Sequence, residues 1–248
     1  MPESTGTDLI YLRDATVAEF DASVVAVDPE TREIALDRTA FYAGGGGQPC
    51  DTGTITGTST WPVEAVRKQG AVAWHRLGGD APLPDVGSAV HGFLNWDDRY
   101  YLMRTHTAMH VLCGTIFRDY GALVTGGNMA LDGARMDFEM DSADFTPERV
   151  AEIEQRVNAE IAAGHDVRVN TLPREEAFQI PDLIRTKINL LPEGITEIRT
   201  VEIVGLDLQA DGGTHVANTR EVGGIRIVGT RSKGKANKRL EIVLTDPA

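Results

Sequence analysis

The feature that most constrains the fold of this 248-residue chain is a change of pattern near residue 97. Before it, short apolar runs are separated by turn residues at close intervals, which is typical of β-strands. After it, "DDRYYLMRTHTAMHVLCGTIFRDYG" places apolar side chains at helical spacing, and Gly121 suits a helix C-terminus. We therefore expect a β-rich domain over residues 1–97 and a second domain over residues 98–248.

The first segment has the pattern of a small all-β unit. Residues 22–36, "ASVVAVDPETREIAL", predict a hairpin, because an apolar run and an alternating run flank a turn that contains proline. Strand-like runs follow over residues 52–57, 62–77 and 87–96. Short strands at this spacing favour a barrel-like domain.

The second segment mixes helices and strands. Thr146 is the expected N-cap of a second helix, with Pro147 at its first position and Gly164 at its end. Four strand-like runs follow, over residues 165–172, 198–205, 223–232 and 238–245. Strands and helices in this order predict an α+β domain with a mainly antiparallel sheet.

The charge distribution bears on the partners. The net charge is −13, and the chain has only five lysines against nineteen arginines. An acidic, lysine-poor surface fits a protein that works in high salt, so we favour a halophilic, haloarchaeal source. Lys233, Lys235 and Lys238 nevertheless gather between Arg231 and Arg239. Such a group is either a phosphate contact or a solvated hairpin tip, and the sequence favours neither.

Several classes of protein are disfavoured. No run approaches the ~18 apolar residues of a membrane span, and the N-terminus lacks the pattern of a secretory signal. We therefore expect a cytoplasmic protein that does not contact membranes. Cys50 and Cys113 are the only cysteines, and we expect free thiols rather than a disulfide framework.

Four residues form a candidate metal site. His106 and His110 lie four residues apart on the first helix, so both imidazoles can reach one ion. Thr107 stands where a metalloprotease motif has its glutamate, which disfavours that class. His215 is the natural third ligand and Asp211 a sensible fourth, because Zn²⁺ accepts carboxylate oxygen. A histidine pair alone is more often explained by packing.

The segment "FYAGGGGQPCDTG", residues 41–53, contains four consecutive glycines. It is either a flexible surface loop or a backbone that approaches a ligand closely, with Gln48 as a polar tip. Gly45, Gly46 and Gly47 are the candidate contacts. Neither a Walker lysine nor the spacing of a dinucleotide motif is present.

These segments together resemble a known family. "FYAGGGGQPCDTG", "FLNWDDRYYLMR", "RTHTAMH" and "LQADGGTHVANTREVGGIRI" occur in the order seen in the editing domain of alanyl-tRNA synthetase and in its free-standing relatives, the AlaX proteins. The resemblance runs from about residue 18 to residue 245 and is closest to the medium-length free-standing form. Each motif is weak alone, but the ordered set is specific.

The resemblance implies trans-editing, the hydrolysis of the ester that joins serine or glycine to alanine tRNA. A synthetase pocket built for alanine cannot exclude similar small side chains strongly, so a second, hydrolytic site is needed. The family holds zinc with a His-x-x-x-His pair and a Cys-x-x-x-His pair. His106, His110 and His215 match, but the cysteine position holds Asp211. Asp211 then either binds zinc directly, supports a ligand, or leaves a coordination position to water.

The resemblance also suggests roles for other residues. Gln48 matches the glutamine that contacts the aminoacyl end. Apart from the resemblance, the hydroxyl of Thr107 or Thr125 is a candidate to hydrogen-bond a serine hydroxyl and so favour serine over alanine. Arg135 and the basic segment 231–239 are candidates to contact the tRNA backbone. Zinc then either activates water or orients the substrate. The expected partner is tRNA(Ala) carrying a wrong amino acid, bound by a monomer or homodimer.

Two alternatives remain at this stage. The departure at residue 211 is compatible with a tRNA-binding module that has kept the fold and lost catalysis. A hydrolase of small esters or amides is the third possibility.

Overall fold

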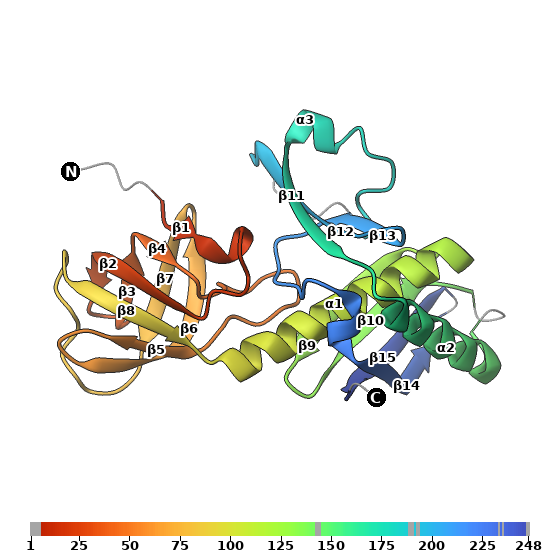
Figure 1. The fold of residues 1–248 in the computed structure, drawn as a ribbon, viewed down its shortest axis with the longest axis horizontal. Helices are drawn as coiled ribbons and strands as arrows, with labels where there is room; N and C mark the ends of the chain where they lie inside the picture. Colours follow the sequence, from red (N-terminus) through yellow and green to blue (C-terminus); the bar gives the residue numbers. More distant parts are fainter. Residues whose placement is uncertain are drawn as a thin grey trace. The chain divides into compact units, whose positions relative to one another are not determined.

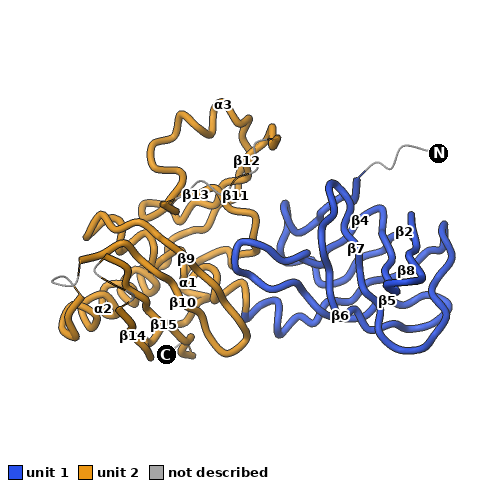
Figure 2. Tube along the Cα trace, turned by 180° about the vertical axis from the view of Figure 1, so that it is seen from behind, with its two compact units in different colours: residues 1–101 blue, residues 102–248 orange. Residues whose placement is uncertain are grey.

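The computed structural model describes residues 6–141, 145–187, 191, 194–232, 234 and 236–246 (Figure 1). The chain divides into two compact units, residues 1–101 and residues 102–248 (Figure 2). Within the described ranges, no helix has both the length and the hydropathy of a membrane span.

The first unit is a closed barrel of antiparallel strands, as the sequence predicts. The strands follow one another around the barrel in the order β2, β3, β7, β6, β5, β8. Their bounds are Glu19–Asp28 (β2), Glu33–Leu36 (β3), Gly53–Thr56 (β5), Thr60–Gln69 (β6), Val72–Leu77 (β7) and Ala89–Leu94 (β8). A short parallel pair, β1 (Asp8–Leu9) with β4 (Arg38–Thr39), and the 3₁₀ turn η1 (Ile10–Leu12) complete the unit. Alternate strand residues point inward, and Trp61 and Phe41 are fully buried among them.

The second unit contains two antiparallel sheets and the helices that accompany them. The four-stranded sheet has the order β14, β15, β10, β9, and the three-stranded sheet has the order β11, β12, β13. The bounds are Val124–Ala130 (β9), Gly133–Glu139 (β10), Val167–Pro173 (β11), Glu197–Ile203 (β12), Asp207–Ala210 (β13), Gly224–Ser232 (β14) and Asn237–Thr245 (β15). The helices are α1 (Trp96–Tyr120), whose first residues up to Tyr101 belong to the first unit, α2 (Pro147–Ala163), the short α3 (Arg174–Ala177) and the 3₁₀ turn η3 (Thr219–Val222). The α+β prediction is therefore confirmed.

The ends of helix α2 follow from their residues. The Thr146 side chain accepts a hydrogen bond from the backbone N–H of Arg149, which caps an otherwise unpaired donor. Pro147 occupies the first helical position, where its missing N–H has no cost. Gly164 ends the helix with a left-handed φ of 80°. Both predicted boundaries are confirmed.

The strands β9, β10 and β13 were not predicted. Strand β9 has the sequence "VTGGNMA", in which adjacent glycines weaken the strand signal. Its pairing with β10 across a tight turn is set by the tertiary packing and not by propensity. The strand packs closely on the helix at Gly127, where an added Cβ would lie 3.2 Å from the end of the Met109 side chain on α1.

A buried ion pair fixes the start of α1 to the barrel. Arg99 is fully buried, and its Nε lies 3.0 Å from Asp51 Oδ2. Its other nitrogens donate to the carbonyl oxygens of Ala15 and Ala40, at 2.8 and 2.6 Å. Asp51 also accepts the backbone N–H of Tyr42 at 2.6 Å, which closes the glycine-rich segment. The Arg99 guanidinium therefore joins the first turn of α1 to the glycine-rich segment and to the backbone at Ala15 and Ala40.

We predict that Asp51→Ala destabilises the protein by about 3–5 kcal/mol, because it leaves the buried Arg99 guanidinium without a counter-charge. Urea denaturation measures the loss. The control is Asp8→Ala, which removes an exposed 2.8 Å pair with Arg13 and should cost less than about 1 kcal/mol. Equal losses in the two variants would show that Asp51 is no more than a surface partner.

Candidate metal centre

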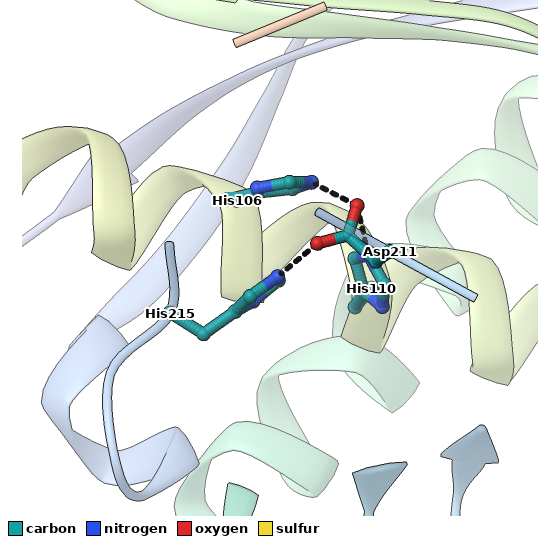
Figure 3. Close-up of side chains that lie close together, drawn as sticks. All are labelled: His106, His110, Asp211 and His215. Carbon is teal, nitrogen blue, oxygen red and sulfur yellow. Dashed lines mark hydrogen bonds and ion pairs between the residues drawn. The ribbon is translucent and has the colours of Figure 1, made fainter. Parts of the chain in front are cut away.

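Three histidines converge in the second unit (Figure 3). His106 and His110 lie on one face of α1, and His215 comes from the loop that follows β13. All three are buried, with ring centroids 4.3 to 5.1 Å apart. Helical spacing brings His106 and His110 together, while His215 lies about a hundred residues later in the chain.

The carboxylate of Asp211 lies between the three rings (Figure 3). Its Oδ2 is 3.1 Å from His215 Nε2, and its Oδ1 is 3.5 Å from His106 Nε2 and 4.0 Å from His110 Nε2. One ligand atom from each of the four residues lies within 4.8 Å of all the others. The four residues singled out in the sequence therefore meet at one point.

Other contacts hold Asp211 in place. Its Oδ2 accepts the backbone N–H of Gly213 at 2.7 Å, and Arg199 on β12 donates to its backbone carbonyl oxygen at 2.9 Å. The glycine that follows Asp211 imposes no special backbone, because Gly212 has no left-handed φ and nothing lies within 4 Å of a Cβ added there. The loop is thus shaped by the hydrogen bonds of Asp211 more than by glycine backbone.

Two of the three histidines and the aspartate have the protonation of metal ligands. Burial alone would lower the pKa of His110, but Asp207 and Asp211 outweigh it and raise that pKa above its usual value. Burial lowers the pKa of His106 well below its usual value and that of His215 to about 4, although Asp211 opposes both shifts. Burial alone would raise the pKa of Asp211, but the surrounding histidines outweigh it and lower that pKa well below its usual value. At neutral pH, His106 and His215 are therefore neutral and Asp211 is charged, which are the forms that coordinate metals.

The donor set fits Zn²⁺. Imidazole nitrogen and carboxylate oxygen are both zinc ligands, and tetrahedral donors lie about 3.3 Å apart when the bonds are about 2.0 Å long. The separations of 3.1, 3.5 and 4.0 Å between the Asp211 oxygens and the three imidazole nitrogens bracket that value. The four ligand atoms lie within 4.8 Å of one another, so the most distant of them must move closer together for four bonds to form.

Thr107 lies behind His215 and is fully buried. Its Oγ1 is 3.2 Å from His215 Nδ1 and accepts the backbone N–H of Val216 at 3.3 Å. These contacts place the Thr107 hydroxyl on the far side of the imidazole from Asp211. They favour a role in orienting the ring.

Thr125 is exposed and occupies a β-bulge. Asp137 pairs with Gly126 and Phe138 with Val124, so Thr125 is the extra residue of strand β9. Its hydroxyl donates to Asn237 Oδ1 at 3.2 Å. Bulges commonly re-aim a side chain beside a functional site.

The glycine-rich segment forms an ordered turn in the first unit. Gly45 and Gln48 exchange backbone hydrogen bonds of 3.0 and 2.9 Å, with Gly46 and Gly47 between them at φ 58° and 91°. Two positive φ angles define a type I′ turn, which strongly favours glycine. Gln48 is only 2% exposed, so its side chain is buried against the protein and does not project into solvent.

The basic residues differ in their surroundings. Arg135 is 40% exposed and lies 3.7 Å from Asp137. Lys238 is only 1% exposed, and its Nζ donates to Ser232 Oγ and to the carbonyl oxygen of Gly234. Its ammonium therefore ties a hairpin together instead of facing solvent. The predicted contacts Lys233 and Lys235 lie outside the described residues.

Two residues near the centre were not singled out in the sequence. Arg199 holds Asp211, and Asp207 lies 3.5 Å from His110. Asp207 precedes Asp211 by four positions, which places both on one face of an extended segment. That even spacing relates Asp207 to Asp211 but does not by itself point to His110.

We predict that Asp211→Ala lowers the affinity for Zn²⁺ by more than about 100-fold. Loss of a residue that only hydrogen-bonds to a metal ligand typically costs about 10- to 100-fold, and loss of a ligand should cost more. Asp211→Cys should retain tight binding, since it replaces one anionic ligand by another. Competition with a chelator measures both. Wild-type affinity in Asp211→Ala would mean that the site is three histidines and water.

Two family models match parts of the chain. Residues 198–241 match the threonyl and alanyl tRNA synthetase second additional domain, which covers β12 to β15 and includes Asp211 and His215. Residues 9–98 match the model of class II (A) tRNA synthetases, which covers the barrel.

Known proteins resemble the chain over its length. An alanyl-tRNA editing protein AlaX-M of Methanosarcina mazei is 38% identical, covering 98% of each chain. One of Saccharolobus solfataricus is 37% identical over 94% of this chain and 97% of its own. The alanine–tRNA ligase of Ignicoccus hospitalis is 37% identical over 96% of this chain but only 26% of the ligase. The chain belongs to the AlaX-M family of alanyl-tRNA editing proteins.

Proposed function

We propose that this protein is a trans-editing deacylase, which hydrolyses the ester of mischarged Ser-tRNA(Ala), Gly-tRNA(Ala) or both with the help of Zn²⁺. The observation that carries the proposal is the convergence of His106, His110, Asp211 and His215 in a chain that aligns end to end with AlaX-M proteins. We place its action in the cytoplasm, on tRNA(Ala), as a monomer or homodimer.

The residues of the cluster have distinct tasks in this proposal. The three histidines and Asp211 hold the ion, and Asp211 keeps the ligand set at one negative charge. Bound there, Zn²⁺ supplies Lewis acidity toward the ester carbonyl or a water. Arg199 fixes the backbone of Asp211 by donating a hydrogen bond to its carbonyl oxygen. We assign the buried Gln48 and the turn Gly45–Gly47 to the aminoacyl end, by resemblance to the family.

Serine selection is assigned to Thr125 in preference to Thr107. The Thr107 oxygen already faces His215 Nδ1 and a backbone N–H, whereas Thr125 is exposed. Thr125 donates its hydrogen to Asn237, so its lone pairs are available to accept a bond from a serine hydroxyl. Arg135 is the exposed cation that we assign to the tRNA backbone.

We predict that His106→Ala lowers the rate of serine release from Ser-tRNA(Ala) by at least about 100-fold, as for other single groups that stabilise developing charge. A chelator should do the same to the wild type, and added Zn²⁺ should restore it. The control is His91→Ala, on the barrel strand β8, which should act like the wild type. Assays belong at high salt because the net charge is −13.

This assay separates the proposed enzyme from the second candidate, a tRNA-binding module. Asp at the family's cysteine position is the observation that favours the module. Zinc-free protein that binds tRNA(Ala) without turnover would support it, and hydrolysis in a metal-free triple-histidine variant would contradict the zinc mechanism.

The two threonines give a second prediction for this site. Thr125→Val should reduce the preference for Ser-tRNA(Ala) over Ala-tRNA(Ala) by about 10-fold, the value of one hydrogen bond. Thr107→Val should slow all substrates alike, because it removes a support of His215. Ratios of kcat/KM for the two substrates measure this, with Thr171→Val on the exposed strand β11 as the control. The reverse pattern would exchange the two assignments.

A further inference from the structure

His110 lies between two carboxylates. Its Nε2 faces Asp211 Oδ1 at 4.0 Å, and its Nδ1 faces Asp207 Oδ2 at 3.5 Å. The Nδ1 atom is buried and has no hydrogen bond of normal geometry among the described residues, so the Asp207 carboxylate lies just beyond hydrogen-bond range of it. Each ring nitrogen therefore has its own anionic neighbour.

The position of Asp207 is tightly determined. Its side chain is fully buried, Arg185 Nε lies 3.3 Å from Oδ1, and Gln209 Nε2 donates to Oδ2 at 2.6 Å. Asp207 also packs directly on α1: a Cβ added at Gly114 would lie only 2.7 Å from the Cβ of Asp207. Gly114 is one helical turn beyond His110. The close approach that glycine permits is what brings this carboxylate to the ring.

We propose that Asp207 is a positioning residue for the metal centre, which accepts a hydrogen bond from the Nδ1–H of His110 and so presents Nε2 to the ion. The proposal rests on the metal-dependent function above. An imidazole whose Nδ1–H is directed to a carboxylate keeps one tautomer and one ring orientation, and its Nε2 becomes a better ligand.

A parallel arrangement at a second histidine supports the proposal. His215 directs Nδ1 to Thr107 Oγ1 at 3.2 Å and Nε2 to Asp211 at 3.1 Å. Two of the three rings thus have a polar partner on Nδ1 and the common carboxylate on Nε2. A role for Asp207 that only stabilised the fold, through Arg185, would not require its carboxylate to face His110.

The test compares Asp207→Asn with Asp137→Asn in the full-length zinc protein. Asp137 is the matched control, because it is also buried and paired with an arginine, Arg239 at 2.6 Å, but contacts none of the three histidines in the contacts described. Asp207→Asn should weaken zinc binding by about 10- to 100-fold and change the absorption spectrum of the Co²⁺-substituted protein. Asp137→Asn should change neither, although its melting temperature falls.

Wild-type zinc affinity and an unchanged Co²⁺ spectrum in folded Asp207→Asn would overturn the proposal. Should that variant fail to fold, NMR of the ¹⁵N-histidine-labelled zinc protein decides, since the proposal requires a protonated Nδ1 and a zinc-bound Nε2 on His110. The opposite assignment overturns it. Wild-type protein that binds no Zn²⁺ would instead refute the metal site itself, and this inference with it.

Discussion

The buried carboxylate of Asp211 is the constraint around which the polar centre of the second unit is built. A buried charge is costly unless it is paired and hydrogen-bonded. Three imidazoles, the Gly213 N–H and the neighbouring Arg199 surround it. Since the imidazoles come from α1 and from the loop after β13, they need the helix, β12 and β13 in one arrangement. The packing of α1 against β12 and β13 therefore also determines whether the four side chains of the centre meet.

Much of the fold follows from local pattern. The barrel hairpins, the first helix and the capped second helix were predictable, because alternation, helical periodicity and cap residues such as Thr146 act over a few positions. Strands β9 and β13 were not. The first contains Gly126 and Gly127, and the second has only four residues, so neither carries a clear signal. Their pairing is decided by contacts with α1 and β12, which a local pattern does not contain.

The residues of the candidate metal centre likewise divide into those that the sequence could predict and those that it could not. His106 and His110 could be paired from sequence because helical spacing fixes their neighbourhood. The addition of Asp211 and His215 rested on chemistry and on resemblance, and the geometry now brings them together. Of the two interpretations of the four glycines, the ordered turn at Gly46–Gly47 and the buried Gln48 do not fit a flexible surface loop, and this could not be decided from the local sequence. Asp207 was missed because its contact with His110 depends on the close approach at Gly114.

In the proposed zinc site, an aspartate at the position where the family's motif has cysteine would keep the charge of the ligand set and change its softness. Thiolate and carboxylate each carry one negative charge, so the balance with Zn²⁺ is the same. The carboxylate, however, gives up the preference of sulfur for soft metals, and selectivity must then come from geometry. Geometry at a histidine-rich site is set by ring orientation. A centre with Asp211 in place of thiolate therefore depends more on the partners of its rings, which are the positions that Asp207 and Thr107 occupy.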